Sequence, residues 1–322
     1  MVENGSPGFE RLLAAVHAEV GRARRIGVTG PPGGGKSTLI ERLTAHYRSA
    51  GGTVGIVAVD PSSPFSGGAL LGDRIRMERS SGDSGVFIRS MASRGSLGGI
   101  ATATGEVADV MDAFGFERIL IETVGVGQSE LDVAAAADTT VVVLVPESGD
   151  GIQVLKAGLM EIADVFVVNK ADRPGADRLR QELEIATGLR RGHAFRHVPA
   201  HHGPGSHETS SAEEGGGRGW EPPVVVTAAF RDEGVGELIE AVDRHFAAIE
   251  ASGELASRRR RRLELRTRDV LERALRRWVW SDTGPKAAVD EALADVIAGR
   301  RSPYEAAAGV VERIRKRDGG MR

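Results

Sequence analysis

The sequence predicts an α/β fold, in which a mainly parallel sheet carries helices on both faces and a helical appendage follows at the C-terminal end. Short apolar runs rich in β-branched residues alternate with longer helical patterns, which is typical of strands buried on both faces of a sheet. The strand-like runs stop after Ser252, and helical periodicity alone continues beyond it. The alternation indicates crossover connections between parallel strands, and its loss indicates a separate helical part.

Seven runs are predicted as strands, and the patterns between them as helices. After a helical lead at Phe9–Arg24, the crossover helices include Thr38–Ser49, Gly99–Phe114 and Ile152–Ala163. The predicted strands are Ile26–Thr29, Val54–Val59, Val86–Arg89, Arg118–Glu122, Thr139–Val145, Val165–Val168 and Val224–Thr227.

The chain is predicted to divide into three parts: an N-terminal helix within residues 1–25, the α/β domain at 26–253 and the helical appendage at 254–322. Residues 190–223 are rich in Gly, His, Ser and Glu and lack apolar periodicity, so they are predicted to be a disordered insertion in the α/β domain. In the appendage, the residues that share one helical face are Val270, Leu271, Ala274, Leu275 and Trp278.

Composition excludes several classes of protein. The chain has no cysteine, which excludes disulfides, thiolate metal sites and cysteine nucleophiles. No apolar run approaches the ~18 residues that indicate a membrane-spanning helix. The first residues have neither the basic patch nor the apolar segment of a secretory signal. These features predict a cytoplasmic protein without a membrane partner.

Charge is distributed unevenly along the chain. The net charge is −3, but residues 254–322 hold 18 basic and 11 acidic residues, a net charge of +7, which leaves −10 on the remainder. The two parts should therefore attract each other, and the basic part could also meet an acidic partner.

A glycine-rich stretch, Gly30-Pro-Pro-Gly-Gly-Gly-Lys-Ser37, matches the pattern G-x-x-x-x-G-K-[ST] between a predicted strand and a predicted helix. Glycines let backbone N–H groups surround a phosphate, and the helix N-terminus adds its positive end. We expect Lys36 to reach the β- and γ-phosphates and the Ser37 hydroxyl to bind Mg²⁺. The motif predicts a P-loop NTPase. The residues expected to line the phosphate site are Gly33, Gly34, Gly35, Lys36, Ser37 and Thr38.

Three carboxylates are candidates for the metal side of this site. Asp60 follows the second predicted strand and Glu122 ends the fourth, so both belong to the strand ends that face the ligand crevice of an open α/β sheet. Asp73 lies beyond the Gly67-Gly68 pair, and its position after a glycine is also that of an ordinary helix N-cap. The predicted metal ligands are Ser37, Asp60, Asp73 and Glu122.

The base is predicted from Asn169-Lys-Ala-Asp172, which directly follows a buried strand. The Asp172 carboxylate would accept hydrogen bonds from the guanine N1–H and 2-amino groups, while Lys170 packs its stem on the ring. Adenine offers no such pair of donors, so the carboxylate would be desolvated without partners, at a cost of ~1–3 kcal/mol. Thr227 and Ala228, after the last strand, would close over the base from the other side. The predicted substrate is GTP.

Read together, several long stretches resemble the MeaB/ArgK family of GTPases. The resemblance is carried by Asp60–Met77, Ile88–Gly99, Ile121–Glu130, Ser148–Lys156 and Asn169–Asp172. It implies a G domain of the signal-recognition-particle/MinD/BioD class. It also implies a chaperone of an adenosylcobalamin-dependent acyl-CoA mutase of the methylmalonyl-CoA mutase type, which gates cofactor loading and protects the mutase. GTP hydrolysis would be slow alone and faster on the partner.

The resemblance also assigns roles to the switch segments. Asp60 and Asp73 would be the metal-side carboxylates of the first switch, and Glu122 would replace the usual Walker B aspartate. Residues 147–156 would form an additional switch that signals to the mutase.

The catalytic residues are less well defined by the sequence. Lys36 would neutralise charge on the γ-phosphoryl group. Gln128, six residues after Glu122, is a candidate to orient the attacking water, and Gln153 and Lys156 in the additional switch are others. No residue is identifiable as a general base, which predicts an incomplete resting site.

A histidine-rich tract offers an alternative function. Five of the eight histidines lie between His193 and His207. Such tracts can bind nickel or zinc, so a metal-insertion GTPase is the main alternative. A surface loop without a metal role is the simpler interpretation, since no other ligand cluster accompanies the tract. The five histidines are His193, His197, His201, His202 and His207.

The appendage suggests two further contacts. Arg258–Arg262 is a run of five arginines, which suggests a surface that binds nucleic acid. Acidic residues follow it and no aromatic set accompanies it, so we favour a helix flank that packs on the acidic domain and predict no nucleic-acid partner. The tail resembles the family's dimerisation arm through Trp278 and Ser302–Glu305, which predicts a homodimer. Trp278 and Trp280 are expected to pack at a dimer or domain interface.

Overall fold

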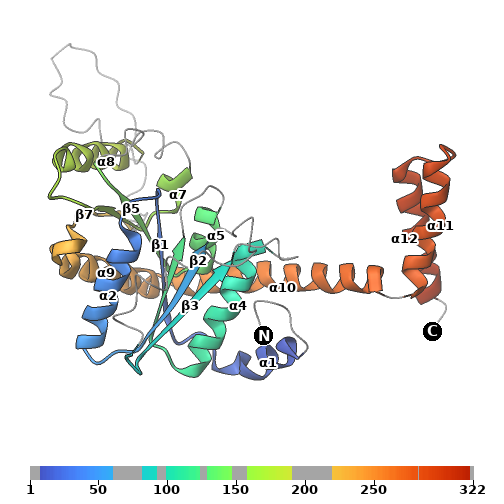
Figure 1. Ribbon diagram of the computed structural model, residues 1–322, viewed down its shortest axis with the longest axis horizontal. Helices are drawn as coiled ribbons and strands as arrows, with labels where there is room; N and C mark the ends of the chain where they lie inside the picture. The colour runs from blue at the N-terminus through green and yellow to red at the C-terminus, as the bar shows by residue number, and fades with distance from the viewer. Residues whose placement is uncertain are drawn as a thin grey trace, which may run out of the picture. The chain divides into compact units, whose positions relative to one another are not determined.

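A parallel β-sheet organises the larger part of the molecule (Figure 1). In this computed structural model the chain divides after Arg262 into an α/β unit and a helical unit. The residues that the structure describes are 8–60, 82–92, 99–123, 129–146, 158–190, 220–281 and 283–319.

Seven strands make up the sheet within the described residues, in the order β3-β2-β4-β1-β5-β6-β7, and every neighbouring pair is parallel. The carboxyl ends of all strands therefore share one edge of the sheet. The strands are β1 (Arg24–Thr29), β2 (Val54–Asp60), β3 (Val86–Ala92), β4 (Arg118–Thr123), β5 (Thr139–Leu144), β6 (Val165–Val168) and β7 (Val224–Val226).

Helices connect the strands and cover both faces. In the α/β unit they are α1 (Phe9–Val16), η1 (His17–Glu19), α2 (Lys36–Ser49), α4 (Gly99–Phe114), α5 (Ser129–Ala136), α7 (Met160–Ile162), α8 (Ala176–Arg190), η4 (Ala229–Arg231) and α9 (Val235–Ala251). The helix α10 (Glu254–Ser281) begins in this unit, and α11 (Thr283–Ile297) and α12 (Pro303–Gly319) complete the helical unit.

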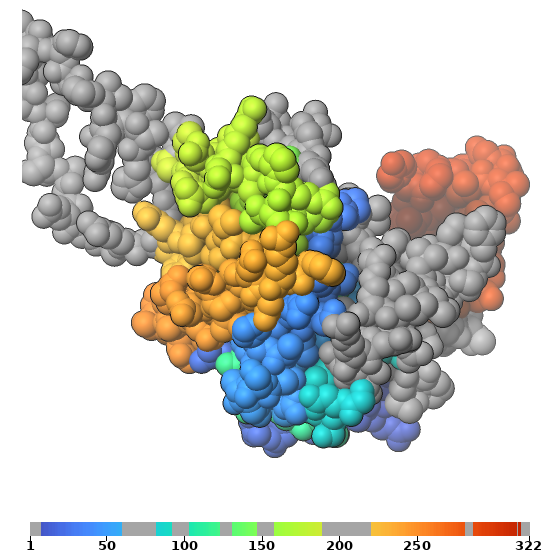
Figure 2. Space-filling view, turned by 60° about the vertical axis from the view of Figure 1, so that its left-hand side comes forward, coloured from blue at the N-terminus to red at the C-terminus, as the bar shows by residue number. Residues whose placement is uncertain are grey.

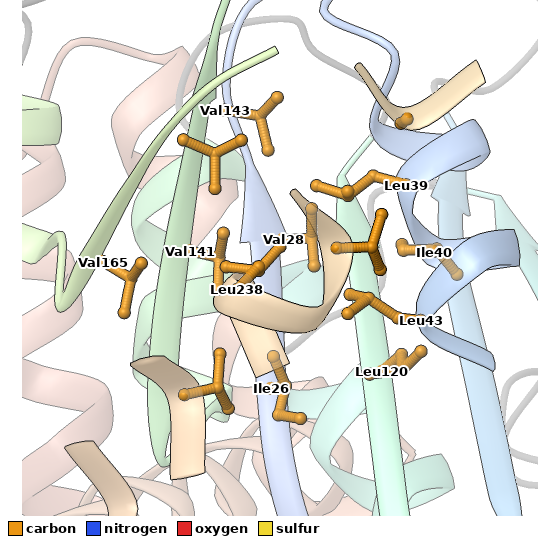
Figure 3. Close-up of a cluster of buried hydrophobic side chains, with 14 of the residues drawn as sticks. Ile26, Val28, Leu39, Ile40, Leu43, Leu120, Val141, Val143, Val165 and Leu238 are labelled. Carbon is orange, nitrogen blue, oxygen red and sulfur yellow. The ribbon is translucent and has the colours of Figure 1, made fainter. Parts of the chain in front are cut away.

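One face of the sheet is covered by α2 and α9, which lie side by side in the space-filling view (Figure 2). Between these helices and the central strands lies a core of fully buried aliphatic side chains (Figure 3). β-Branched residues from the strands meet leucine and isoleucine from the helices, which gives a dry contact surface. The labelled members of this core are Ile26, Val28, Leu39, Ile40, Leu43, Leu120, Val141, Val143, Val165 and Leu238.

The opposite face of the sheet is covered by α4 and α5, and by α8 beside β5 and β6. Alternate residues of each strand point to opposite faces, so Leu120 of β4 packs toward α2 while Ile119 and Ile121 pack toward α4 and α5. Phe166 of β6 is buried with Leu183 of α8 in a third cluster. Both faces are therefore apolar, as the near-continuous apolar runs of the sequence predict.

The predicted fold class is confirmed, and each predicted strand lies within three residues of its observed bounds. The helical lead was predicted too long: it ends at Glu19, and β1 already begins at Arg24. Asp112 of α4 explains the difference, because its carboxylate accepts hydrogen bonds from the backbone N–H groups of Gly21, Arg22 and Ala23. Because these N–H groups are bonded to Asp112, they are not available for the backbone hydrogen bonds of a longer helix.

The arginine run of α10 contacts the amino-terminal edge of the sheet. Arg258 binds Asp164, just before β6, and Arg259 and Arg262 bind Asp138, just before β5, at 2.7–3.1 Å. Both aspartates are buried. These three arginines therefore hold α10 on the acidic part of the chain, whereas Arg260 and Arg261 are exposed. We call the five bonded residues, Arg258, Arg259, Arg262, Asp138 and Asp164, the arginine latch.

Further contacts complete the surroundings of the latch carboxylates. Asp138 also accepts the backbone N–H of Arg25 at 3.1 Å, and Asp164 accepts that of Thr140 at 2.8 Å. The imidazole of His245, fully buried on α9, lies 3.1 Å from Asp164 and 2.8 Å from the Thr139 hydroxyl.

The latch shifts the ionisation of its carboxylates. Burial acts to raise the pKa of Asp138, but the hydrogen bond from Arg259 and the charges of Arg262 and Arg259 outweigh it, so the pKa is lowered. Asp164 behaves likewise: burial acts to raise its pKa, and hydrogen bonds from His245 and Arg258 lower it below the ordinary value. Both residues therefore stabilise the folded state as carboxylates.

The helical unit, from Leu263 onward, consists of the end of α10 together with α11 and α12. The helices α11 and α12 pack on each other, and Arg313 of α12 binds Glu291 of α11 at 2.5 Å. Among the described residues, no helix combines the length and the apolar character needed to cross a membrane.

Substituting Asp138 should destabilise the fold. Asp138→Asn is expected to lower the free energy of unfolding by about 3 kcal/mol at pH 7, because Arg259 and Arg262 lose their carboxylate. Since the folded-state pKa of Asp138 is depressed, its contribution is present above about pH 4 and lost as the pH falls below it. Urea unfolding at pH 7, 5 and 3.5 measures both effects, and the variant should lose less stability on acidification than the wild type.

The matched control for this experiment is Arg261→Ala, which removes an exposed arginine from the same run. Its free energy of unfolding should stay within ~0.5 kcal/mol of the wild type. Equal destabilisation by the two substitutions would contradict the assignment of a specific latch.

Candidate nucleotide site

The loop between β1 and α2 lies at the carboxyl edge of the sheet and depends on its glycines. Gly30, Gly33 and Gly35 all have positive φ angles, of 134°, 75° and 82°. A Cβ atom at Gly30 would lie 2.1 Å from the Val143 carbonyl oxygen, and one at Gly35 would lie 2.5 Å from Asn169 Nδ2. Larger residues are therefore excluded at these two positions, and α2 begins directly afterwards with its positive end at the loop.

Lys36, the first residue of α2, is buried and lies folded over this loop. Its Nζ donates hydrogen bonds to the carbonyl oxygens of Gly30 at 2.8 Å and Pro31 at 3.0 Å. The loop thus holds a cation at its centre, close to the helix N-terminus, and this arrangement favours a polyanion.

Ser37 and Glu122 come together on the metal side of the site. The Ser37 hydroxyl donates to Glu122 Oε1 at 2.6 Å, and Glu122 is buried at the end of β4. Hydroxyl and carboxylate oxygens are the hard ligands that Mg²⁺ prefers, so the pair fits this ion. Asp60 ends the neighbouring strand β2, but its side chain lies outside the described part, as does all of Asp73. The described residues contain no cluster of three or more His, Asp or Glu side chains suited to a metal.

Asn169 connects the phosphate loop to the predicted base site. It follows β6 and is buried, and its Nδ2 donates to the Gly34 carbonyl at 2.8 Å. Its Oδ1 accepts hydrogen bonds from the Thr227 hydroxyl at 3.0 Å and from the Ala229 backbone N–H at 3.1 Å. One amide side chain therefore joins its own segment to two others, at Gly34 and at Thr227–Ala229, that are far away in the sequence.

The two residues that were predicted to contact the base after Asn169 lie next to the β7 end. Lys170 has a φ angle of 58°, and the following N–H, of Ala171, donates to the Thr227 carbonyl at 3.0 Å. The Asp172 carboxylate is partly exposed, and Arg231 Nη2 lies 3.8 Å from it.

Most of the predicted nucleotide-binding residues thus lie at one edge of the sheet. Gly34 is bonded to Asn169, Asn169 to Thr227, and Ala228 follows Thr227 in the chain. The predicted residues that lie outside the described part of the chain are Asp73, Gln128, Gln153, Lys156, the whole switch at 147–156 and the histidines of the 193–207 tract. Of the predicted insertion at 190–223, the structure describes Arg190, which is the last residue of α8, and Trp220–Pro223. Trp220 Nε1 donates to the Asp164 carbonyl at 2.7 Å.

Sequence reasoning missed Arg42 of α2, whose guanidinium binds the backbone after Ala228. It lies six residues after Lys36, outside the phosphate-loop pattern. A single arginine on an amphipathic helix carries no signal of such a contact, so no pattern in the chain could have found it.

The fold and this loop define the class of the protein as a P-loop GTPase, and the comparisons with known proteins agree. The sequence profile described as "Methylmalonyl Co-A mutase-associated GTPase MeaB" matches residues 1–283. The chain therefore belongs to the MeaB family.

Relatives and a solved structure support this assignment. A relative from Pyrococcus abyssi, described as a GTPase, is 43% identical over 95% of this chain and 93% of its own length. GTPase ArgK of Escherichia coli is 34% identical over 79% of this chain and 72% of its own length. The mouse mitochondrial methylmalonic aciduria type A homolog is 37% identical over 73% of this chain, which covers 52% of that protein. A crystal structure of a LAO/AO transport system kinase aligns with a TM-score of 0.60 and 26% identity, over 95% of this chain and 86% of its own.

Removing the Asn169 side chain should weaken nucleotide binding. Asn169→Ala is expected to raise the Kd for GDP at least about tenfold, because the Gly34 carbonyl, the Thr227 hydroxyl and the Ala229 N–H lose their partner. Titration with a fluorescent GDP analogue measures the change, and circular dichroism checks that the fold is kept.

Asn169→Asp refines this experiment. It keeps an acceptor for Thr227 and Ala229 but loses the donor to Gly34, so its Kd should lie between those of the wild type and the alanine variant. Unchanged GDP affinity in the alanine variant would show that the bridge does not organise the site.

Proposed function

We propose that this GTPase is a cytoplasmic chaperone of an adenosylcobalamin-dependent acyl-CoA mutase of the methylmalonyl-CoA mutase type, gating cofactor loading and protecting the mutase. The observation that carries the proposal is the match of residues 1–283 to a family described by its association with that mutase. The relation to the methylmalonic aciduria type A homolog supports the same partner class.

In the proposed mechanism the nucleotide lies across the carboxyl edge of the sheet. The phosphate loop and Lys36 would bind the β- and γ-phosphates, and Lys36 would exchange its bonds to Gly30 and Pro31 for phosphate oxygens. Asn169 would hold the loops in register, while Asp172 would accept the guanine N–H groups and Thr227 and Ala228 would close over the base.

The metal side of the mechanism uses Ser37 and Glu122, which would hold Mg²⁺ together with Asp60 and Asp73. When bound, Mg²⁺ neutralises charge on the β- and γ-phosphate oxygens. The short Ser37–Glu122 hydrogen bond supports this role, since both oxygens already converge on one point.

Activation of water would depend on the partner. Gln128, Gln153 and Lys156 are the proposed residues for orienting water and completing charge neutralisation, and the switch at 147–156 would carry the signal. Lys36 and Ser37 are already bonded, Lys36 to the carbonyl oxygens of Gly30 and Pro31 and Ser37 to Glu122, so they would have to exchange these bonds before acting on a phosphate. This requirement is consistent with slow hydrolysis in the absence of the mutase.

The mutase should accelerate GTP hydrolysis. Phosphate release from GTP is expected to rise about tenfold or more when a methylmalonyl-CoA mutase is added, because docking supplies the missing charge-stabilising groups. Lys36→Ala should abolish the stimulated rate. ATP in place of GTP is the substrate control.

The outcome that would contradict this proposal is a fast rate that the mutase leaves unchanged. Stimulation by a nickel-enzyme precursor instead of the mutase would favour the metal-insertion alternative.

A homodimer through the helical unit is part of the same proposal. Large apolar side chains are exposed on this unit, and such sets on helices mark interfaces. They include Leu271, Leu275, Trp280, Leu293 and Ile297, which are 50–78% exposed.

Mass determination by light scattering should therefore give twice the chain mass of 34.0 kDa. Leu275→Glu in the helical unit should shift the protein towards the monomer, because a charge would replace buried apolar area at the interface. The matched control is Ile185→Glu on α8, which is 60% exposed in the α/β unit and should leave the mass unchanged. A monomeric wild type at micromolar concentration would refute the homodimer.

A further inference from the structure

The loop after β7, residues 227–234, is held from two sides. We call it the base loop, because Thr227 and Ala228 are the residues proposed to close over the guanine. On its inner side, Asn169 accepts hydrogen bonds from Thr227 and Ala229. Its outer side faces α2, the helix that begins at the phosphate loop.

Two side chains of α2 bind the outer side of the base loop. Arg42 Nε donates to the Ala229 carbonyl and its Nη2 to the Phe230 carbonyl, both at 3.1 Å. His46 Nε2 lies 3.1 and 3.2 Å from the two carboxylate oxygens of Asp232. Arg42 and His46 are four residues apart, so they share one face of the helix.

Burial shows why these polar contacts matter to the base loop. Thr227, Ala228 and Ala229 are buried, but the outer part of the loop has no hydrophobic anchor, since Phe230 is 85% exposed. The outer part is therefore positioned by hydrogen bonds, and those from a guanidinium are charge-assisted and stronger than neutral ones.

Ala229 is the residue at which the two sides meet. Its N–H donates to Asn169 and its carbonyl accepts from Arg42, so both of its backbone polar groups are fixed by side chains from other segments. The adjacent residue, Ala228, is thereby restrained as well, with its N–H bonded to the Glu233 carbonyl at 3.0 Å.

The base loop also carries Arg231, whose guanidinium lies 3.8 Å from the Asp172 carboxylate. A shift of the loop would move this cation relative to the group proposed to read the base. The position of the base loop therefore affects both Asp172 and the Thr227–Ala228 pair, which are the two groups proposed to contact the base.

We infer that Arg42 is a positioning residue for guanine recognition: by binding the carbonyls of Ala229 and Phe230 it holds the base loop against the base and ties it to the helix of the phosphate loop. This role rests on the assignment of residues 169–172 and 227–228 to the base and is independent of the mutase. In this role Arg42 acts through the base loop.

The experiment compares Arg42→Ala and Arg42→Lys with Arg48→Ala. Arg48 is a matched control on the same helix, because its guanidinium binds Asp83 and the Gly52 carbonyl at the C-terminal end of α2 rather than the base loop. The readouts are the Kd and dissociation rate of N-methylanthraniloyl GDP, the Kd of the corresponding ADP analogue, and the thermal unfolding midpoint.

Arg42→Ala is expected to raise the Kd for GDP about tenfold, mainly through faster dissociation, and to reduce the preference for GDP over ADP. Arg42→Lys, which can reach one carbonyl but not both, should recover part of the affinity. Arg48→Ala should lower the unfolding midpoint and leave affinity and base preference unchanged.

Three results would overturn parts of this inference separately. If folded Arg42→Ala retains wild-type affinity and base preference, then Arg42 has no positioning role. If Arg42→Ala does not fold, wild-type affinity and preference in Arg42→Lys would contradict the need for bonds to both carbonyls. If the wild type itself does not distinguish GDP from ADP, the assignment of the base site is wrong, and the inference falls with it.

Discussion

The hydrogen bonds of the Asn169 side chain join the loops of the candidate nucleotide site. The phosphate loop, the Asn169–Asp172 segment and the base loop come from three places in the chain, and each follows a different strand. Parallel strands bring these ends to one edge, but the sheet alone leaves the loops unconnected. The buried Asn169 amide joins the three loops, because it donates a hydrogen bond to Gly34 and accepts hydrogen bonds from Thr227 and Ala229. Gly35 must lack a side chain because Asn169 lies against it.

Buried charges have different kinds of partner at the two edges of the sheet. At the carboxyl edge, Lys36 is bonded to backbone carbonyls near a helix N-terminus. It could exchange these bonds for bonds to a phosphate. At the amino edge, Asp138 and Asp164 are permanently matched by the arginine latch. Removing either partner of such a buried pair would leave an unpaired buried charge, so the latch fixes where α10 begins relative to the strands.

The sequence predicted those features that are encoded locally. The strands follow from runs such as Val141–Leu144, and the phosphate loop and Asn169–Asp172 are short contiguous patterns whose spacing reflects their chemistry. The contacts between segments were not predictable in this way. Arg42 and Ala229 are 187 positions apart, and Arg259 and Asp138 are 121 apart. Composition suggested that the basic run could pack on the acidic domain, but it could not say which three arginines are used, since that depends on the rotation of α10.

Trp220 has a consequence for the chain that precedes β7. It is the first described residue after α8, and its indole is bonded to the Asp164 carbonyl and packs edge-on against His245, with ring centroids 4.9 Å apart. The three-residue strand β7 then leads straight into Thr227. The chain is thus anchored just before β7 at Asp164, the same aspartate that binds Arg258 of α10. A change in the number of residues between 191 and 219 therefore need not alter how β7 leads into Thr227.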